Sequence, residues 1–203
     1  VSQAVHADSL DEQRNRYAQI KQAWDNKQMD TVQALMPTLK DYPLYPYLEY
    51  RQITDDLMNQ PTVTVNNFIQ ANPTLPPART LKSRFVNELA RREDWRGLLA
   101  FSPDKPGATE AQCNYYYAKW ATGQQEEAWA GAKELWLTGK SQPNACDPLF
   151  SAWRASGKQD PLSYLERIRL AMKAGNTRLV TVLAGQMPAD YQTIASAVIS
   201  LAN

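Results

Sequence analysis

Few residues in this sequence have the types and spacing that chemistry requires. Glycoside cleavage, for example, needs a carboxyl group with a raised pKa in an apolar cleft, in some enzymes beside a second carboxyl group. Tight acidic doublets occur at Asp55-Asp56 and Glu126-Glu127, and each doublet lies beside a polar residue. We interpret both as exposed, solvated faces. Because no nucleophile motif and no phosphate-binding glycine loop is present either, the sequence predicts no catalytic residue.

The two cysteines, Cys113 and Cys146, form the second candidate group. In an exported protein, an isolated pair of this kind is best explained by a disulfide bond that joins them. The alternative, a reactive thiol or a metal ligand, needs partners that the sequence does not supply, because the single histidine, His6, lies in a segment that we expect to be removed. We therefore expect no metal ion and no other cofactor.

The N-terminal residues predict export. Val5-His6-Ala7 places small residues at the third and first positions before a polar segment, which is the pattern that signal peptidase cleaves. We interpret residues 1–7 as the tail of a signal peptide that is cleaved after Ala7. The mature chain is then expected to begin at Asp8 in an oxidising extracytoplasmic space, the periplasm.

Aromatic side chains are the candidate binding residues, because their faces can stack against sugar rings. Four tyrosines lie within nine residues, where packing against a proline-rich corner is favoured over ligand stacking. In a second cluster, helical spacing places Tyr116 and Trp120 on one face, which we expect to be core, while the neighbouring tyrosines point elsewhere. The possible glycan contacts are Tyr42, Tyr45, Tyr47, Tyr50, Tyr115 and Tyr117.

The charge balance argues against two classes of partner. With 22 Lys and Arg residues against 21 Asp and Glu residues, no long-range field exists to attract nucleic acid or an anionic bilayer. The longest nearly uncharged apolar stretch, residues 194–202, is far shorter than the roughly 20 residues that span a membrane. Arg91, Arg92 and Arg96 alternate with acidic residues, which favours local ion pairs over an anion site. We expect no nucleic-acid partner and no membrane span.

Helical patterns position these groups in the first part of the chain. Ser9 and Glu12 fit a capping box, so a helix is predicted to begin there. Its apolar stripe contains Leu10, Tyr17, Ile20 and Trp24. Pro37 is predicted to interrupt the second helix, because proline lacks a donor and clashes with the preceding turn. In the proline-rich segment that follows, helices are predicted over 47–57 and 61–71.

The helical pattern continues beyond the proline-rich segment. Leu81, Phe85 and Leu89 form one stripe, and Asp94 is predicted to cap the next helix. Gly123 separates two helices, the second of which carries small residues that permit close approach. This arrangement predicts a pair of the tetratricopeptide type.

Two Asp-Pro pairs, Asp147-Pro148 and Asp160-Pro161, are predicted to start further helices, with the aspartate as the capping residue. In total about a dozen short amphipathic helices can bury their stripes only against neighbouring helices. The sequence therefore predicts an all-α fold, a right-handed α-superhelix or solenoid, with a compact orthogonal bundle as the alternative. The last helix is apolar and lacks a polar cap, so we expect a truncated array or a further domain.

Three long stretches carry a resemblance to a known family. Residues 40–51 (KDYPLYPYLEYR), 91–101 (RREDWRGLLAF) and 112–120 (QCNYYYAKW) closely resemble the N-terminal part of the soluble lytic murein transglycosylases of the Gram-negative periplasm. The resemblance extends over residues 8–203. It implies a U-shaped α-superhelical domain with an internal disulfide, followed by a linker domain and a lysozyme-like catalytic domain.

The family's catalytic motifs do not occur in this chain. No Glu-Ser pair, Gly-Leu-Met-Gln or Ala-Tyr-Asn is found. The hypothesis is that residues 8–203 form a non-catalytic scaffold within an enzyme that cleaves the MurNAc–GlcNAc bond of peptidoglycan to an anhydro product. The scaffold would restrict or orient glycan strands for the missing linker and catalytic domains. The alternative is a helical-repeat docking module for other cell-wall proteins.

Overall fold

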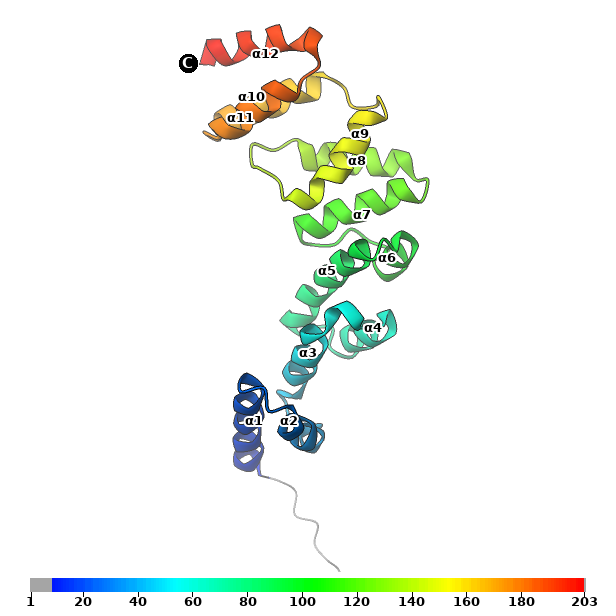
Figure 1. Ribbon diagram of the computed structural model, residues 1–203, viewed down its shortest axis with the longest axis vertical. Coiled ribbons are helices and arrows are strands. Elements are labelled where there is room, and N and C mark those ends of the chain that lie inside the picture. Colours follow the sequence, from blue (N-terminus) through cyan, green and yellow to red (C-terminus); the bar gives the residue numbers. More distant parts are fainter. Residues whose placement is uncertain (1–8, 203) are drawn as a thin grey trace, which may run out of the picture. The chain divides into compact units, whose positions relative to one another are not determined.

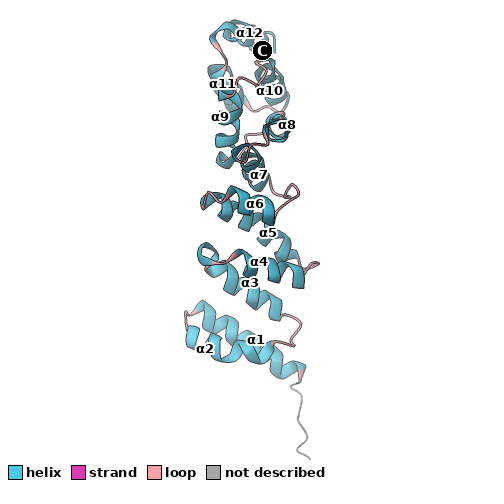
Figure 2. Ribbon diagram, turned by 90° about the vertical axis from the view of Figure 1, so that its right-hand side faces the viewer, coloured by secondary structure: helices cyan, strands magenta, loops and turns pink. Residues whose placement is uncertain are grey.

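The computed structural model describes residues 9–202, apart from the side chain of Ala202. Within this range every regular element is a helix, so the all-α prediction is confirmed (Figure 1, Figure 2). The predicted cleavage site after Ala7 and His6 lie outside the described residues. The elements are α1 (Leu10–Asp25), α2 (Met29–Leu35), η1 (Met36–Leu39), α3 (Tyr45–Asp55), η2 (Leu57–Asn59), α4 (Thr62–Ala71), α5 (Pro76–Arg91), α6 (Trp95–Phe101), α7 (Thr109–Ala121), α8 (Gln125–Trp136), η3 (Asn144–Cys146), α9 (Asp147–Ala155), α10 (Leu162–Lys173), α11 (Thr177–Gln186) and α12 (Ala189–Ala202).

The chain divides into two compact units. Unit 1 ends at Arg79 and unit 2 begins at Thr80, so the boundary falls within α5. Among the residues described, no helix combines the length and the apolar character that a membrane crossing requires.

In unit 1, α1 begins as the capping box predicts. The Ser9 hydroxyl accepts a hydrogen bond from the backbone N–H of Glu12, at 3.1 Å. Ile20 and Trp24 are buried. Leu10, predicted to lie on the same stripe, is instead 61 % exposed. The buried residues of α1 all lie in its C-terminal half, where α2 and η1 pack, so its first turn projects into solvent.

Proline residues set the helix boundaries of unit 1. α2 ends at Leu35, and Pro37 lies in the 3₁₀ helix η1 that follows, as the missing proline N–H predicts. Pro46 occupies the first turn of α3, where its missing donor costs nothing, and Pro61 precedes α4. The two helices predicted over 47–57 and 61–71 are thus observed, with ends shifted by no more than two residues.

Unit 2 contains the predicted stripe and cap. Leu81, Phe85 and Leu89 are at most 1 % exposed, and Phe85 meets Phe101 of α6 edge to face at 5.0 Å. The Asp94 carboxylate accepts a hydrogen bond from the N–H of Gly97, at 3.0 Å. This cap satisfies an otherwise unpaired donor at the start of α6.

The predicted α7–α8 pair forms, with one glycine in the turn between the helices and another at their contact. Gly123 adopts φ of +89° in the turn, a conformation that glycine reaches at little cost. On α8, a Cβ atom at Gly131 would collide with the ring of Tyr116 on α7. The absence of a side chain there allows the two helices to pack closely.

The predicted disulfide is confirmed. Cys113 of α7 and Cys146 of η3 are bonded, and both residues are fully buried. The bond closes a loop with a sequence separation of 33 residues and ties the α7–α8 pair to the start of α9.

The two Asp-Pro helix starts differ from the prediction in detail. α9 begins at Asp147 itself, so this aspartate is not the cap. The physical reason is that Cys146 already has helical dihedral angles, φ −81° and ψ −16°, and η3 therefore continues directly into α9. Asp160 does act as a cap, because its carboxylate accepts from the N–H of Leu162 at 2.9 Å, although α10 begins one residue after Pro161.

Candidate functional site

A cleft in unit 2 combines aromatic, amide and charged side chains. It has a volume of about 350 Å³ and is formed by residues of α5, α6, α7 and the start of α9. We call it the Trp95 cleft. The residues that line it are Asn87, Ala90, Arg91, Glu93, Trp95, Glu110, Asn114, Tyr117 and Pro148.

Helix capping and aromatic packing position the two rings of the Trp95 cleft. Trp95 is the first residue of α6, directly after the capping Asp94. Its ring centroid lies 4.9 Å from that of Tyr117, in an edge-to-face arrangement, and Tyr117 also meets Trp120 at 5.2 Å. Both lining rings are half-buried, so each is fixed by packing while part of it faces the cleft.

An amide pair supplies hydrogen-bonding groups beside the rings. The Asn114 side-chain amide Nδ2 donates to the side-chain Oδ1 of Asn87 at 2.9 Å. Each amide has more hydrogen-bonding positions than this one bond uses, so the pair can also serve a ligand. Glu93 and Glu110 are exposed at the cleft.

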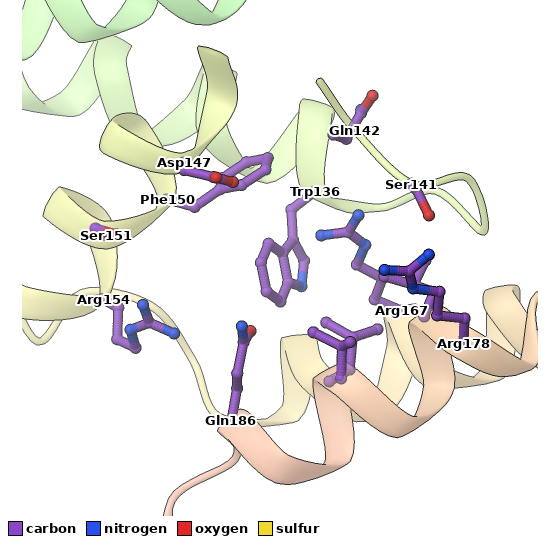
Figure 3. A pocket seen from close by; sticks show the side chains of 13 residues that line it. Trp136, Ser141, Gln142, Asp147, Phe150, Ser151, Arg154, Arg167, Arg178 and Gln186 are labelled. Atoms are coloured by element: carbon purple, nitrogen blue, oxygen red, sulfur yellow. The ribbon is translucent and has the colours of Figure 1, made fainter. Parts of the chain in front are cut away.

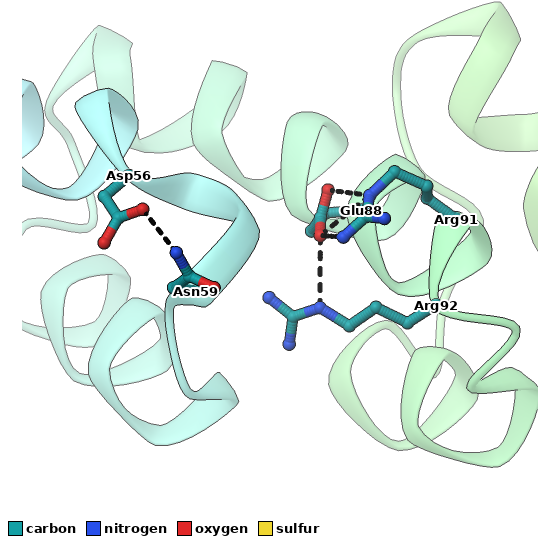
Figure 4. A network of polar contacts seen from close by, with 5 residues as sticks. All are labelled: Asp56, Asn59, Glu88, Arg91 and Arg92. Carbon is teal, nitrogen blue, oxygen red and sulfur yellow. Dashed lines mark hydrogen bonds and ion pairs between the residues drawn. The ribbon is translucent and has the colours of Figure 1, made fainter.

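Arg91, which also lines the Trp95 cleft, forms a local ion pair, as the sequence predicts. Its guanidinium binds Glu88, one turn earlier on α5, through Nη2 at 2.6 Å and Nε at 3.0–3.1 Å, instead of the neighbouring Glu93 or Asp94 (Figure 4). Arg92 also donates to Glu88 at 3.2 Å. Glu88 and Arg91 lie one helical turn apart on α5 and face each other, whereas Glu93 and Asp94 lie beyond the end of that helix. The hydrogen bond from Arg91 is the main reason that the pKa of Glu88 is lowered.

The first tyrosine cluster lies in unit 1 and is divided between core and surface. Tyr42 is only 8 % exposed and packs on Tyr17, with ring centroids 5.5 Å apart. Tyr45 and Tyr50 are half-buried, and Tyr50 lies 6.4 Å from Phe68. Tyr47 is 38 % exposed, the most of the four, and has a face available for stacking.

In the second cluster, the structure reverses one expectation. Tyr115 was expected to point away from the core, yet it is 7 % exposed and its hydroxyl donates to the Pro103 carbonyl at 3.1 Å. Tyr116, assigned to the core face, is half-buried. The reason is that α7 packs against α6, α8 and α9, so more than one of its faces is covered. Tyr117 lines the Trp95 cleft.

Sequence reasoning missed Glu49. It lies in a second cleft, of about 410 Å³, between α3 and α4 of unit 1. Burial raises the pKa of Glu49, the one ionisable residue among those that line this cleft. Glu49 is a single carboxyl group and does not belong to an acidic doublet. The signal that could have identified it is its helical spacing from Gln52 and Ile53, which places the three residues on one face. A carboxyl group that keeps its proton to higher pH can donate a hydrogen bond.

The structure offers no arrangement for a metal ion within residues 9–202. No group of three His, Cys, Asp or Glu side chains lies in a geometry that could hold one.

Comparison with known proteins places these features in context. No protein-family model matches the chain. The sequence is 87 % identical over all 203 residues to the soluble lytic murein transglycosylase of Escherichia coli, and 85 % identical over 199 residues to that of Salmonella typhimurium. The chain spans about a third of the length of these relatives, 32 % and 31 % respectively.

Solved structures agree with the sequence comparison. The crystal structure of the 70 kDa soluble lytic transglycosylase from Escherichia coli matches 97 % of this chain with a TM-score of 0.92 and 89 % identity, and the match covers 32 % of that chain. An inactive mutant of the lytic transglycosylase Slt from Pseudomonas aeruginosa matches 92 % of this chain with a TM-score of 0.84 and 34 % identity, over 30 % of its own length. The resemblance inferred from the sequence is confirmed: the chain is similar in sequence along its whole length, and in fold over 97 % of it, to a segment of the soluble lytic murein transglycosylases.

Proposed function

We propose that this chain is a non-catalytic part of a periplasmic lytic transglycosylase, and that residues 8–203 form the N-terminal part of its α-superhelical U-shaped domain. The intact enzyme would cleave the MurNAc–GlcNAc bond of peptidoglycan with formation of an anhydro product. The sequence identity to proteins that carry the transglycosylase name supports this assignment. The chain would contribute by restricting or orienting glycan strands for the catalytic domain.

The observation that carries the orienting role is the Trp95 cleft. A half-buried indole edge to face with Tyr117 and adjacent to a pair of asparagine amides offers both contacts that a sugar needs, an apolar face and hydrogen-bonding groups. Such a contact, far from any reacting bond, holds a strand in place and thereby lowers the entropic cost of presenting it for cleavage.

A titration with uncrosslinked murein glycan strands tests this role. Trp95→Ala is expected to weaken binding by about 10-fold or more, because a stacked ring is removed. Tyr47→Ala is the matched control, since Tyr47 is an exposed aromatic residue of unit 1 and does not line the Trp95 cleft. Glu110→Ala changes an exposed cleft residue without removing a packed ring and is expected to weaken binding less. Loss of binding in Tyr47→Ala alone would instead assign glycan contact to the tyrosines of unit 1.

A digestion experiment tests the assignment to a non-catalytic part. Purified peptidoglycan is incubated with this chain and, separately, with the full-length enzyme, and anhydro-muropeptides are measured by mass spectrometry. Product is expected from the full-length enzyme alone. Product from this chain would overturn the proposal, because it would require an active site within these residues.

A docking role for other cell-wall enzymes is the second candidate. It is favoured by apolar side chains exposed on two helices of unit 2, since Val182 of α11 and Ile194 of α12 are each 46 % exposed. Val182→Glu and Ile194→Glu would disrupt such docking without touching the Trp95 cleft. Lost capture of a defined cell-wall enzyme with unchanged glycan binding would favour docking over strand orientation.

A further inference from the structure

A second cleft of unit 2 gathers three arginines around an aromatic floor. It has a volume of about 400 Å³ and is lined by residues of α8, α9, α10, α11 and the loop after α8. The lining includes Arg154, Arg167 and Arg178 but a single acidic residue, Asp147. Figure 3 shows Arg154 on one side of Trp136, with Arg167 and Arg178 on the other. We call it the Arg167 cleft.

Arg167 is the unusual member of this group. Arg167 is only 4 % exposed. Its guanidinium lies over the rings of Trp136 and Phe150, at 4.5 and 5.7 Å from their centroids. Nη2 donates to the Lys140 carbonyl at 3.2 Å, whereas Nε is buried with no hydrogen-bond partner. Burial lowers the pKa of Arg167 to about 10, so the group remains charged at neutral pH.

A buried cation without a counter-ion is costly. Within the described part of the chain, no carboxylate lies within ion-pair distance of Arg154, Arg167 or Arg178. Contacts with aromatic faces recover part of the lost hydration, but they do not neutralise the charge. The arrangement therefore suits an anion that arrives from outside the chain.

The neighbouring residues hold the other two arginines without neutralising them. Arg154 donates to the Tyr164 hydroxyl at 3.1 Å and is otherwise exposed, and Arg178 is exposed on α11. The Trp136 indole N–H is already satisfied by the Ser163 carbonyl at 3.0 Å, so the aromatic floor does not compete for a polar ligand. Leu179 and Val182 provide an apolar wall.

We propose that the Arg167 cleft binds carboxylate groups of a short acidic peptide, namely the peptide that murein carries on its glycan strands. A planar guanidinium matches a carboxylate through two parallel hydrogen bonds, and arginines on both sides of Trp136 suit a ligand with more than one carboxylate. The apolar wall suits aliphatic peptide side chains, and the volume is of the order that small ligands require. The choice of murein as the source of the peptide rests on the proposed function.

Calorimetric titration of the chain tests this proposal with three probes. The first is a free murein stem peptide, the second is the same peptide with its carboxylates amidated, and the third is inorganic phosphate. The acidic peptide is expected to bind at least about 10-fold more tightly than the amidated form, because the charge-assisted hydrogen bonds are lost. Equal binding of the two peptides, or phosphate binding as tight as that of the acidic peptide, would overturn the assignment.

Variants locate the binding within the cleft. Arg154→Gln and Arg178→Gln change exposed residues and are each expected to weaken peptide binding by about 5-fold or more. Arg169→Gln is the matched control, since Arg169 is exposed on α10, the helix of Arg167, and does not line the cleft. An equal loss in Arg169→Gln, or no loss in the two cleft variants, would contradict the proposal.

Arg167→Met separates a binding role from a structural one. If Arg167 is held for an external anion, the variant loses peptide binding but unfolds at the same or a higher urea concentration, since the uncompensated charge is gone. A lower unfolding midpoint with retained peptide binding would show a structural role and overturn the proposal. The proposed function can be tested separately. If the acidic peptide does not bind but glycan strands bind the wild-type chain and not Trp95→Ala, the strand-orienting role stands and only the peptide site is wrong.

Discussion

Units 1 and 2 are built from similar helices but are stabilised in different ways. A core cluster of unit 1 joins α1, α2, η1 and the start of α3, and it contains no covalent link. In unit 2 a core cluster extends from α7 to α12, includes the Cys113–Cys146 disulfide, and places Trp136 edge to face with Phe150 and Tyr164 at 5.1 and 5.0 Å. The contacts that hold the cluster of unit 1 are therefore all noncovalent, whereas unit 2 adds a covalent link between its helices.

Removing the disulfide is expected to have the largest effect, and to act on unit 2. The double substitution Cys113→Ser and Cys146→Ser opens the loop that the disulfide closes between residues 33 positions apart. The free energy of unfolding should fall by about 4 kcal/mol, because the unfolded chain gains entropy. Hydrogen exchange, measured peptide by peptide, should show faster exchange in α7, α8 and α9 than in the wild type. If hydrogen exchange becomes equally faster in α1 and α2, the disulfide does not stabilise unit 2 selectively.

Gly131→Ala is expected to have the next largest effect. The added Cβ would collide with the Tyr116 ring in the α7–α8 contact, so unfolding should become easier by about 1–3 kcal/mol. The control is Gly185→Ala on α11, where a Cβ meets nothing within 4 Å. That control should stabilise the helix by about 0.5–1 kcal/mol, since alanine restricts the unfolded chain. Urea unfolding measures both changes, and equal destabilisation in both would rule out the proposed collision.

In unit 1, a single hydrogen bond between α1 and α3 should have a measurable effect. The Trp24 indole N–H donates to the Asp55 carboxylate at 2.6 Å. Asp55→Ala should lower the free energy of unfolding by about 1–2 kcal/mol, because a buried donor loses its charged acceptor. Asp56→Ala is the control, since Asp56 is exposed and its carboxylate accepts a hydrogen bond from the nearby Asn59 side chain, at 2.8 Å (Figure 4).

A double-mutant cycle with Trp24→Phe isolates this hydrogen bond. Asp55→Ala should lower the free energy of unfolding by less in the Trp24→Phe background than in the wild type, because the indole N–H donor is already absent. If Asp56→Ala lowers the free energy of unfolding as much as Asp55→Ala does, the hydrogen bond between Trp24 and Asp55 makes no specific contribution to stability.

The smallest expected effects are on pH dependence, and they have opposite signs in the two units. Burial raises the pKa of Glu49 in unit 1, so the folded state favours its protonated form. The stability that this proton binding contributes is fully present below the ordinary pKa of 4.5 and is lost as the pH rises through the raised value. Glu49→Gln should therefore unfold at a higher urea concentration than the wild type at pH 7, and the difference should disappear near pH 3.

Glu88 in unit 2 should behave in the opposite way. Its hydrogen bond with Arg91 lowers its pKa, so its contribution is present above 4.5 and is lost as the pH falls through the lowered value. Glu88→Gln should lower the free energy of unfolding at pH 7 by about 0.5–1 kcal/mol, and by less in acid. Glu93→Gln changes an exposed residue of the same segment and serves as the control. Matching pH profiles for Glu49→Gln and Glu88→Gln would contradict both assignments.

Most of the accurate predictions concern structures that depend on residues close together in the chain. The Ser9 and Asp94 caps, the break at Pro37 and the turn at Gly123 each follow from a side chain or backbone conformation within a few residues. The disulfide was also predictable, because two cysteines allow a single pairing. Asp147 shows where local reasoning fails, since η3 leads directly into α9 and leaves that aspartate inside the helix.

What the sequence alone determined is therefore the helical class, most helix boundaries, the disulfide and the relationship to the lytic transglycosylases. What only the tertiary structure decided is which faces are covered and where clefts form. Tyr115 is buried because the segment around Pro103 reaches its hydroxyl, and Arg167 is buried because Trp136, 31 positions earlier, lies beneath its guanidinium. Helical spacing places a side chain on a face of its own helix, but it carries no information about what packs against that face.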